Sequence, residues 1–79
     1  MKLPRNLDAD DLIKALSRIG YVVVRQTGSH VRLHCSGPVH AITIPNHRPL
    51  RVGTLAAILQ DVEIAFGMER ATLVATLFD

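Results

Sequence analysis

Hydrophobic residues follow a helical period near both ends of the chain and alternate with polar residues between them. The first helical stripe predicts a helix that begins at Asp8 as its N-cap, where Leu7 and Leu12 are spaced as a hydrophobic staple. Gly20 is expected to end this helix as its C′ residue. The stripe facing the core should consist of Leu12, Ile13, Leu16 and Ile19, and the side toward water of Lys14, Ser17 and Arg18.

Three strands are predicted next, because β-branched and aromatic residues cluster there between turn residues. The first strand covers residues 21–26, the second begins at His30 and the third covers residues 39–44. Apolar and polar positions alternate in the second strand, which places one set on a buried face and the other on an open face. The buried set is Val31, Leu33 and Cys35, and the open set is His30, Arg32 and His34. Taken singly, such histidines are more typical of ordinary surface or core positions than of catalytic ones.

The same alternation predicts how the second and third strands pair. The matched pairs are Cys35 with His40, Leu33 with Ile42, and Val31 with Ile44. In this register the apolar residues of both strands share one face, whereas a slip of one residue would bury Ile42 behind the polar row. The matched register predicts a four-residue loop over residues 36–39.

This register also distributes the histidines along the sheet. His30 would lie opposite the point where residues 45–47 leave the third strand, so that His30 and His47 share one rim. His34 and His40 would lie at the other end, near the hairpin. His30 and His34 have the spacing of a metal-binding pair on a helix, but on a strand they would be about 13 Å apart. We therefore expect no metal site and no metal cofactor here.

Two further helices are predicted after residues 45–49, which two prolines mark as a loop. The first begins between Arg51 and Thr54, and its buried stripe consists of Leu55, Ile58, Leu59 and Val62. Gly67 then interrupts the chain before a last helix over residues 68–78. The apolar edge of that helix consists of Leu73, Val74, Leu77 and Phe78. We expect this edge to cover the core, and contact with a partner is the alternative.

The predicted order of helix, three antiparallel strands, helix and short C-terminal helix is that of an α+β fold. It predicts a two-layer sandwich in which the helices cover the apolar face of the sheet. With 79 residues the chain is expected to form one domain, residues 1–79, that is too small for a deep substrate cavity. An enzyme of this size would work at a shallow surface site, which suits a macromolecular substrate better than a small molecule.

The charges are distributed unevenly, although the net charge is only +2. No Asp or Glu occurs between Leu12 and Gln60. All four histidines lie in this interval, together with Lys14, Arg18, Arg25, Arg32, Arg48 and Arg51. Because solvated faces normally mix charges of both signs, an acid-free centre indicates a polyanionic partner, most simply one that carries phosphates. A chance distribution in so small a protein is the alternative.

The sequence does not have the features of a membrane or secreted protein. It contains no apolar run of about 18 residues, and residues 1–5 lead into the acidic Asp8, Asp10 and Asp11, so we expect neither a membrane span nor a signal peptide. The single cysteine, Cys35, falls on the apolar side of a strand, where it is expected to pack as a small hydrophobic residue. A reducing cytoplasm is the expected location.

Histidine and arginine on one open sheet face suggest general acid–base cleavage of RNA. A ribose 2′-hydroxyl attacks the neighbouring phosphorus if a base removes its proton, a cation stabilises the added negative charge and an acid protonates the leaving 5′-oxygen. Imidazole can perform either proton transfer without a metal, because its ordinary pKa is about 6.5. His30 is the candidate base or acid, and His47 is a second candidate proton carrier. Arg25 and Arg32 are the candidate phosphate stabilisers.

Other candidate contacts to RNA are Ser29, Lys14 and Arg48. The pair Gly28-Ser29 is a weak candidate for a phosphate-binding loop, because it lacks further glycines and a lysine and joins two strands. A basic sheet face that binds RNA without cleaving it remains an alternative to the nuclease. An adaptor whose apolar last helix contacts a partner is a third interpretation.

Three short motifs occur in a distinctive order: Gly28-Ser29-His30, then Ile44-Pro45-Asn46-His47, then Gly53-Thr54-Leu55-Ala56-Ala57-Ile58-Leu59. With these motifs the chain, from about Leu7 to Gln60, resembles the HicA family of toxin–antitoxin modules. That family consists of small mRNA interferases with a fold like that of double-stranded-RNA-binding domains. The segment from Val62 to Asp79 is longer and more apolar than the resemblance implies.

The resemblance implies a specific activity and specific partners. Proteins of this family cleave mRNA without a metal cofactor and are neutralised by a HicB-type antitoxin protein that is usually encoded next to them. Their activity depends on the histidine of the Gly-Ser-His turn, which corresponds to His30, while Gly28 and Ser29 shape that turn. His47 corresponds to the second recurrent histidine of the family.

Overall fold

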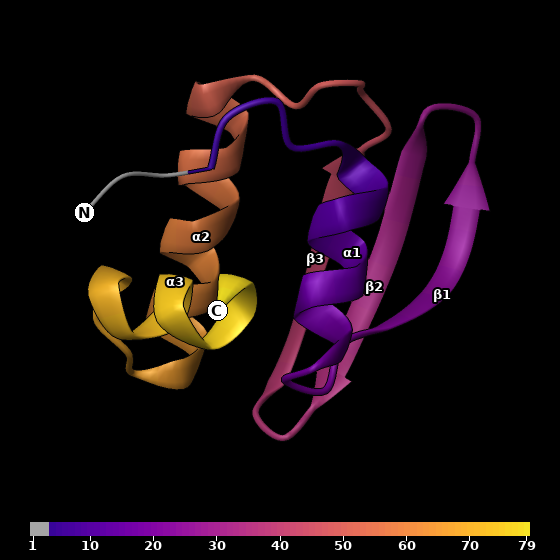
Figure 1. Ribbon diagram of the computed structural model, residues 1–79. Helices are drawn as coiled ribbons and strands as arrows, with labels where there is room; N and C mark the ends of the chain where they lie inside the picture. Colours follow the sequence, from indigo (N-terminus) through magenta and orange to yellow (C-terminus); the bar gives the residue numbers. More distant parts are fainter. Residues whose placement is uncertain (1–3) are drawn as a thin grey trace.

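The computed structural model describes residues 4–79 and consists of one helix, a three-stranded sheet and two more helices (Figure 1). In chain order the elements are α1 (Ala9–Ser17), β1 (Val22–Thr27), β2 (His30–Ser36), β3 (Val39–Pro45), α2 (Val52–Phe66) and α3 (Arg70–Phe78). The predicted α+β order is therefore confirmed. Residues 1–3, which entered the expectation that no signal peptide is present, lie outside the described part. Among residues 4–79, no helix has both the length and the hydropathy needed to cross a membrane.

Helix α1 begins and ends at the residues that the sequence indicates. The Asp11 carboxylate accepts a hydrogen bond of 3.1 Å from the backbone N–H of Asp8, the N-cap. After the helix, the N–H of Tyr21 donates to the carbonyl of Leu16 at 3.2 Å, and Gly20 has a φ of 107°. This geometry is that of a helix ended by a C′ glycine, as predicted. The buried face is Ala9, Leu12, Ala15 and Leu16, whereas Ile13 and Ile19 are only half-buried.

The sheet is antiparallel with the strand order β1-β2-β3. Strands β2 and β3 pair as predicted: Cys35 with His40, Leu33 with Ile42, and Val31 with Ile44. Ser36 and Val39 also pair, which leaves only Gly37 and Pro38 as the connection, so the prediction of a four-residue loop was wrong. The ladder extends by one more pair in the same register, and the side chains of Ser36 and Val39 lie on the same face as Arg32 and His34.

The predicted buried stripe of α2, namely Leu55, Ile58, Leu59 and Val62, is confirmed. Helix α3 buries Leu73, Val74 and Leu77 in the same core, so this helix covers the core as expected. Polar contacts also hold this helix against α1 and α2. The Arg70 guanidinium forms an ion pair with Glu63 on α2, and Arg18 at the end of α1 donates to the carbonyl of Leu77 at 3.3 Å.

The helices leave one face of the sheet open to solvent. Val31, Leu33, Cys35, Ile42 and Ile44 face the helices and are buried. The alternate positions of β2 and β3 lie on the other face, which we call the open face, and His30, His34 and Thr43 among them are exposed. Helix α1 lies over β2 and β3, and β1 lies beside them at the outer edge of the sheet (Figure 1). All six residues of β1 are accordingly exposed.

Candidate functional site

The open face contains a shallow hollow of about 500 Å³ near the turn between β1 and β2. It is lined by Arg25, Thr27, His30, Arg32 and Thr43, so all three strands contribute to it. We call it the open-face hollow. It contains three of the residues predicted from the sequence, namely His30, Arg25 and Arg32, and none of its five lining residues is acidic. Such a hollow suits an anion.

The two-residue turn Gly28-Ser29 sets the pairing that brings Arg25 into this hollow, and a β-bulge follows on the far side of Arg25. Val23 pairs with Leu33, but the next pair along the ladder is Arg25 with Arg32, so Val24 is an extra residue without a partner. Without this extra residue, the ladder counted from the turn would pair Val24 with Leu33, so the bulge decides which of the three valines faces the helices. Arg25 and Thr27 lie between the turn and the bulge, and they share the open face with their partners Arg32 and His30.

Arg32 is held in place within the hollow. Its guanidinium donates a hydrogen bond of 2.9 Å to the hydroxyl of Thr43, its partner on β3. On its other side it is paired with Arg25 on β1. The two guanidinium groups therefore belong to directly opposed positions on one face, an arrangement that is unfavourable unless an anion lies between them.

His30 is the first residue of β2 and follows a tight turn of Gly28 and Ser29, in which Gly28 has a φ of 54°. A non-glycine residue rarely adopts this left-handed conformation. The Ser29 hydroxyl lies 3.4 Å from Nδ1 of the His30 ring. The ring is otherwise exposed, which leaves it accessible to a ligand in the hollow.

A short hydrogen bond ties this turn to the loop that follows β3. The backbone N–H of Asn46 donates to the carbonyl of Ser29 at 2.6 Å. The two motifs that stand out in the sequence, Gly28-Ser29-His30 and Ile44-Pro45-Asn46-His47, are therefore adjacent in space. Asn46 thus helps to position the turn that carries His30.

His47 lies at the same rim of the sheet as His30 but does not line the hollow. His30 pairs with Pro45, two residues before His47, and the side chain of His47 is exposed. Its backbone joins the rim to α1, because its carbonyl accepts a hydrogen bond of 3.2 Å from the N–H of Ala9. The structure therefore brings His47 to the predicted rim, outside the set of five residues that line the hollow.

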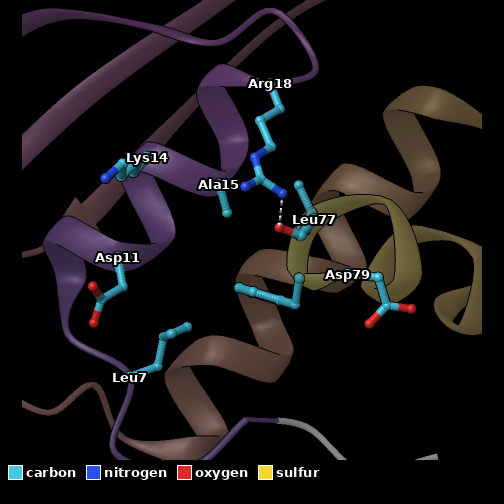
Figure 2. Close-up of a pocket in the computed structure, with 8 residues that line it drawn as sticks. Leu7, Asp11, Lys14, Ala15, Arg18, Leu77 and Asp79 are labelled. Atoms are coloured by element: carbon cyan, nitrogen blue, oxygen red, sulfur yellow. Dashed lines mark hydrogen bonds between the residues drawn. The ribbon is translucent and has the colours of Figure 1, made fainter.

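Two predicted RNA contacts, Lys14 and Arg48, lie in other places. Lys14 lines a cleft between α1 and α3, in the helical layer, together with Asp11, Arg18 and Leu77 (Figure 2). Arg48 forms an exposed ion pair of 2.9 Å with Asp10 at the start of α1. Neither residue lines the open-face hollow. The candidate contacts from the sequence thus divide into a cluster around His30 and separate positions near α1.

Thr27 and Thr43 line the hollow but were not among the candidates from the sequence. Thr43 could have been predicted from the register, because a pairing of Leu33 with Ile42 also pairs Arg32 with Thr43. Thr27 lies just outside the predicted first strand, residues 21–26, whereas in the structure it ends β1 and pairs with His30 across the two-residue turn. Within residues 4–79, no three His, Cys, Asp or Glu side chains lie close enough together to hold a metal ion.

The hollow places the imidazole of His30 beside the permanent positive charges of Arg25 and Arg32. Imidazole exchanges protons near neutral pH. The guanidinium groups of Arg25 and Arg32 can donate several hydrogen bonds each to an oxyanion. The threonine hydroxyls add neutral donors at the margin. Such a set can bind a phosphate and stabilise additional negative charge on it.

Comparison with known proteins gives one match. A family model described as HicA toxin of bacterial toxin-antitoxin matches residues 9–64. This range begins with α1, contains all three strands with every residue of the open-face hollow, and ends within α2. The searches of curated proteins and of solved structures gave no significant match.

Proposed function

Because the chain belongs to the HicA family of toxins of bacterial toxin–antitoxin systems, we propose that it is a metal-independent endoribonuclease that cleaves mRNA. We propose the open-face hollow as its active site. The observation that carries this proposal is the position of His30, an exposed imidazole in one hollow with two arginines that have no acidic neighbour there. A macromolecular substrate agrees with the shallow, open shape of the site.

The proposed reaction is an internal transfer at phosphorus. A base removes the proton of a ribose 2′-hydroxyl, and the 2′-oxygen forms a bond to the adjacent phosphorus while the bond from phosphorus to the 5′-oxygen breaks. An acid then protonates the leaving 5′-oxygen, and the products are a 2′,3′-cyclic phosphate and a 5′-hydroxyl. His30 performs one of the two proton transfers.

Arg25 and Arg32 stabilise the reacting phosphate in this proposal. The phosphorus gains a fifth oxygen in the transition state, and the negative charge on its non-bridging oxygens increases. Two guanidinium groups at opposed positions on β1 and β2 supply donors to those oxygens. The hydrogen bond from Arg32 to Thr43 fixes one guanidinium before the substrate arrives, which limits the entropy lost on binding.

The second proton carrier is assigned to His47. It lies at the same rim as His30, because Pro45, the partner of His30, is two residues before it. Ser29 contributes by contact with the His30 ring. Lys14 and Arg48 do not line the hollow, and in this proposal they contact parts of a long RNA outside it.

The alternative to a nuclease is a module that binds RNA through the same hollow without cleaving it. It deserves a direct test because the arginines alone suffice for binding. The test is incubation of the purified protein with a long single-stranded RNA in excess chelator, with cleavage and filter binding measured in parallel. Wild type is compared with His30→Ala and with His34→Ala, which alters an exposed histidine on the same face and strand outside the hollow.

We expect wild type and His34→Ala to cleave, and His30→Ala to bind RNA with the cleavage rate reduced about 10²–10⁴-fold. If His30→Ala cleaves as fast as wild type, the assignment of His30 is wrong. If wild type binds naked RNA without cutting it, the same comparison is made in a translating extract. Intact messages there as well would identify the protein as a binding module.

The family implies an antitoxin partner, and we propose that this is a HicB-type protein encoded next to the toxin. A toxin that cleaves mRNA acts in the cytoplasm, where messages are translated. Binding of an antitoxin at the open face would prevent RNA from reaching His30.

A further inference from the structure

Strand β1 forms one edge of the sheet, and within residues 4–79 it pairs only with β2. Its outer side therefore presents backbone N–H and carbonyl groups to solvent, where a further strand can pair with them. All six residues of β1 are exposed, because α1 lies over β2 and β3 instead (Figure 1). The edge is thus accessible from both faces of the sheet.

Three consecutive valines occupy this edge, and we call Val22, Val23 and Val24 the valine edge. They are 60%, 49% and 50% exposed, respectively. Val22 pairs with His34 and so lies on the open face, whereas Val23 pairs with the buried Leu33 and lies on the helix side. The edge therefore presents apolar side chains on both faces. Contact with another strand would remove them from water.

Exposed edges of sheets are commonly protected by lysine, by proline, by a covering element or by a bulge. Residues 22–24 contain neither a charged residue nor proline, and the bulge at Val24 leaves all three valine side chains exposed. Valine is also among the residues that strands favour. The valine edge therefore has the chemistry of a site for addition of a strand.

The valine edge is complementary to itself in the antiparallel direction. If two copies pair with Val23 opposite Val23, then Val22 of each copy lies opposite Val24 of the other, and only valines meet at the centre. The two Arg25 residues then lie four positions apart along the strands, or about 13 Å, where salt screens most of their repulsion. A parallel pairing in register would place Arg25 opposite Arg25 and is disfavoured.

We propose that two copies of this chain associate through the valine edge, with their β1 strands antiparallel, to form one continuous sheet. Residues directly opposite each other in paired strands lie on the same face. Both open-face hollows therefore lie on the same side of the dimer, and neither is covered by the second copy. Because each copy contributes one strand, the contact is small, and the association is weak and depends on concentration.

The test is sedimentation equilibrium of the full chain from about 1 µM to about 1 mM, a range that covers weak association. Val24→Lys adds the charge that natural edges use, at a residue without a partner on β2. Ile64→Lys is the matched control, because it adds the same charge at an apolar residue of α2 that is 74% exposed. Circular dichroism checks that both variants fold.

A cross-link tests the same contact without the added charge. The proposed symmetry brings two Val23→Cys thiols opposite each other, whereas the natural Cys35 is buried. Ile64→Cys is the control for an exposed thiol elsewhere. Both proteins are incubated with oxidised glutathione, and covalent dimers are measured by gel electrophoresis without reductant.

We expect the mass of wild type and of Ile64→Lys to rise toward that of two chains as the concentration increases. Val24→Lys should dimerise about tenfold more weakly or worse, and only Val23→Cys should form the covalent dimer. Wild type that stays monomeric, a dimer that Ile64→Lys weakens instead of Val24→Lys, or absence of the Val23→Cys cross-link would each overturn the proposal. No RNA enters these measurements, so they are independent of the proposed nuclease activity.

Discussion

Arg25 and Arg32 occupy directly opposed positions on β1 and β2, on the face of the sheet that no helix covers. Like charges at such positions destabilise a sheet, and no acidic side chain lines their hollow to offset the repulsion. The pair is set by the two-residue turn Gly28-Ser29, from which the ladder runs without interruption to Arg25 and Arg32. A feature that costs stability is best explained by an anion that it binds.

The arginine pair predicts opposite effects on stability and on activity. Arg25→Gln removes one of two repelling charges, so the free energy of unfolding should rise by about 0.2–1 kcal/mol. The same change removes charged hydrogen bonds to the phosphate, so kcat/KM for RNA cleavage should fall about 10- to 100-fold. Urea denaturation and steady-state cleavage of one RNA measure the two effects.

Arg51→Gln is the control for loss of a positive charge, because Arg51 is exposed at the start of α2 and does not line the hollow. It should alter cleavage little. The slope of log affinity against log salt concentration should decrease by about one for Arg25→Gln. If Arg25→Gln cleaves RNA at the wild-type rate, the arginine pair is not part of the active site.

The Gly28 turn predicts a backbone effect on His30. An added Cβ at Gly28 meets nothing within 4 Å, so any loss of stability arises from its φ of 54° and not from a clash. Gly28→Ala should lower the free energy of unfolding by about 1–2 kcal/mol and reduce cleavage, because the turn that presents His30 must change. Thermal unfolding followed by circular dichroism measures the first effect.

Gly53→Ala serves as the comparison for Gly28→Ala. Gly53 lies in the first turn of α2, and an added Cβ there also meets nothing within 4 Å. Alanine is the better helix former, so this variant should gain up to about 1 kcal/mol of stability with unchanged cleavage. Equal stabilisation by both alanines would show that the left-handed turn is absent in solution.

The strand register was predictable because one strand alternates strictly. Val31, Leu33 and Cys35 can share the core with Ile42 and Ile44 in only one alignment, and the structure has that alignment. The ends of α1 were also predictable, because Asp8 is a favoured N-cap residue and Gly20 is a favoured residue just after the end of a helix.

The bulge in β1 was not predictable from the same pattern. Val22, Val23 and Val24 are identical residues in a row, so they contain no alternation that would show which of them is extra. The faces on which Val22 and Val23 lie depend on that choice, whereas Arg25 and Thr27 lie on the turn side of the bulge. The separation of Lys14 and Arg48 from the hollow could not be predicted either, because the order of charges along the chain does not show which layer of the fold each residue occupies.

From the packing of α3 we predict that residues after position 64, where the family match ends, are needed for folding. The match ends at residue 64, yet Leu73 on α3 is fully buried in the common core. Leu73→Ala should lower the free energy of unfolding by about 2–5 kcal/mol, which is a large part of the stability of a small protein. Thr72→Ala, at an exposed position of the same helix, should change it by less than about 0.5 kcal/mol. Similar small effects of both variants would mean that α3 does not belong to the folding unit.

The last prediction concerns alkaline stability and Tyr21, the only tyrosine of the chain. Tyr21 is buried against Phe66, and its hydroxyl forms a hydrogen bond of 2.6 Å with Nδ1 of His40. Burial raises the pKa of Tyr21 from 10.0 to about 12, with smaller contributions from Cys35 and Asp61. An absorbance titration of the phenol reports this pKa directly, because no other tyrosine or tryptophan contributes.

The raised pKa of Tyr21 sets the sign of the effect on stability. The unfolded chain releases the phenolic proton near pH 10, whereas the folded protein keeps it until about pH 12. The stabilisation is therefore complete below pH 10 and is lost as the pH rises to about 12, by an amount on the order of 2 kcal/mol. Tyr21→Phe should be less stable by about 1 kcal/mol at neutral pH, because it lacks the hydrogen bond to His40, and should lack this alkaline decline. An equal decline in both proteins would assign alkaline unfolding to other groups.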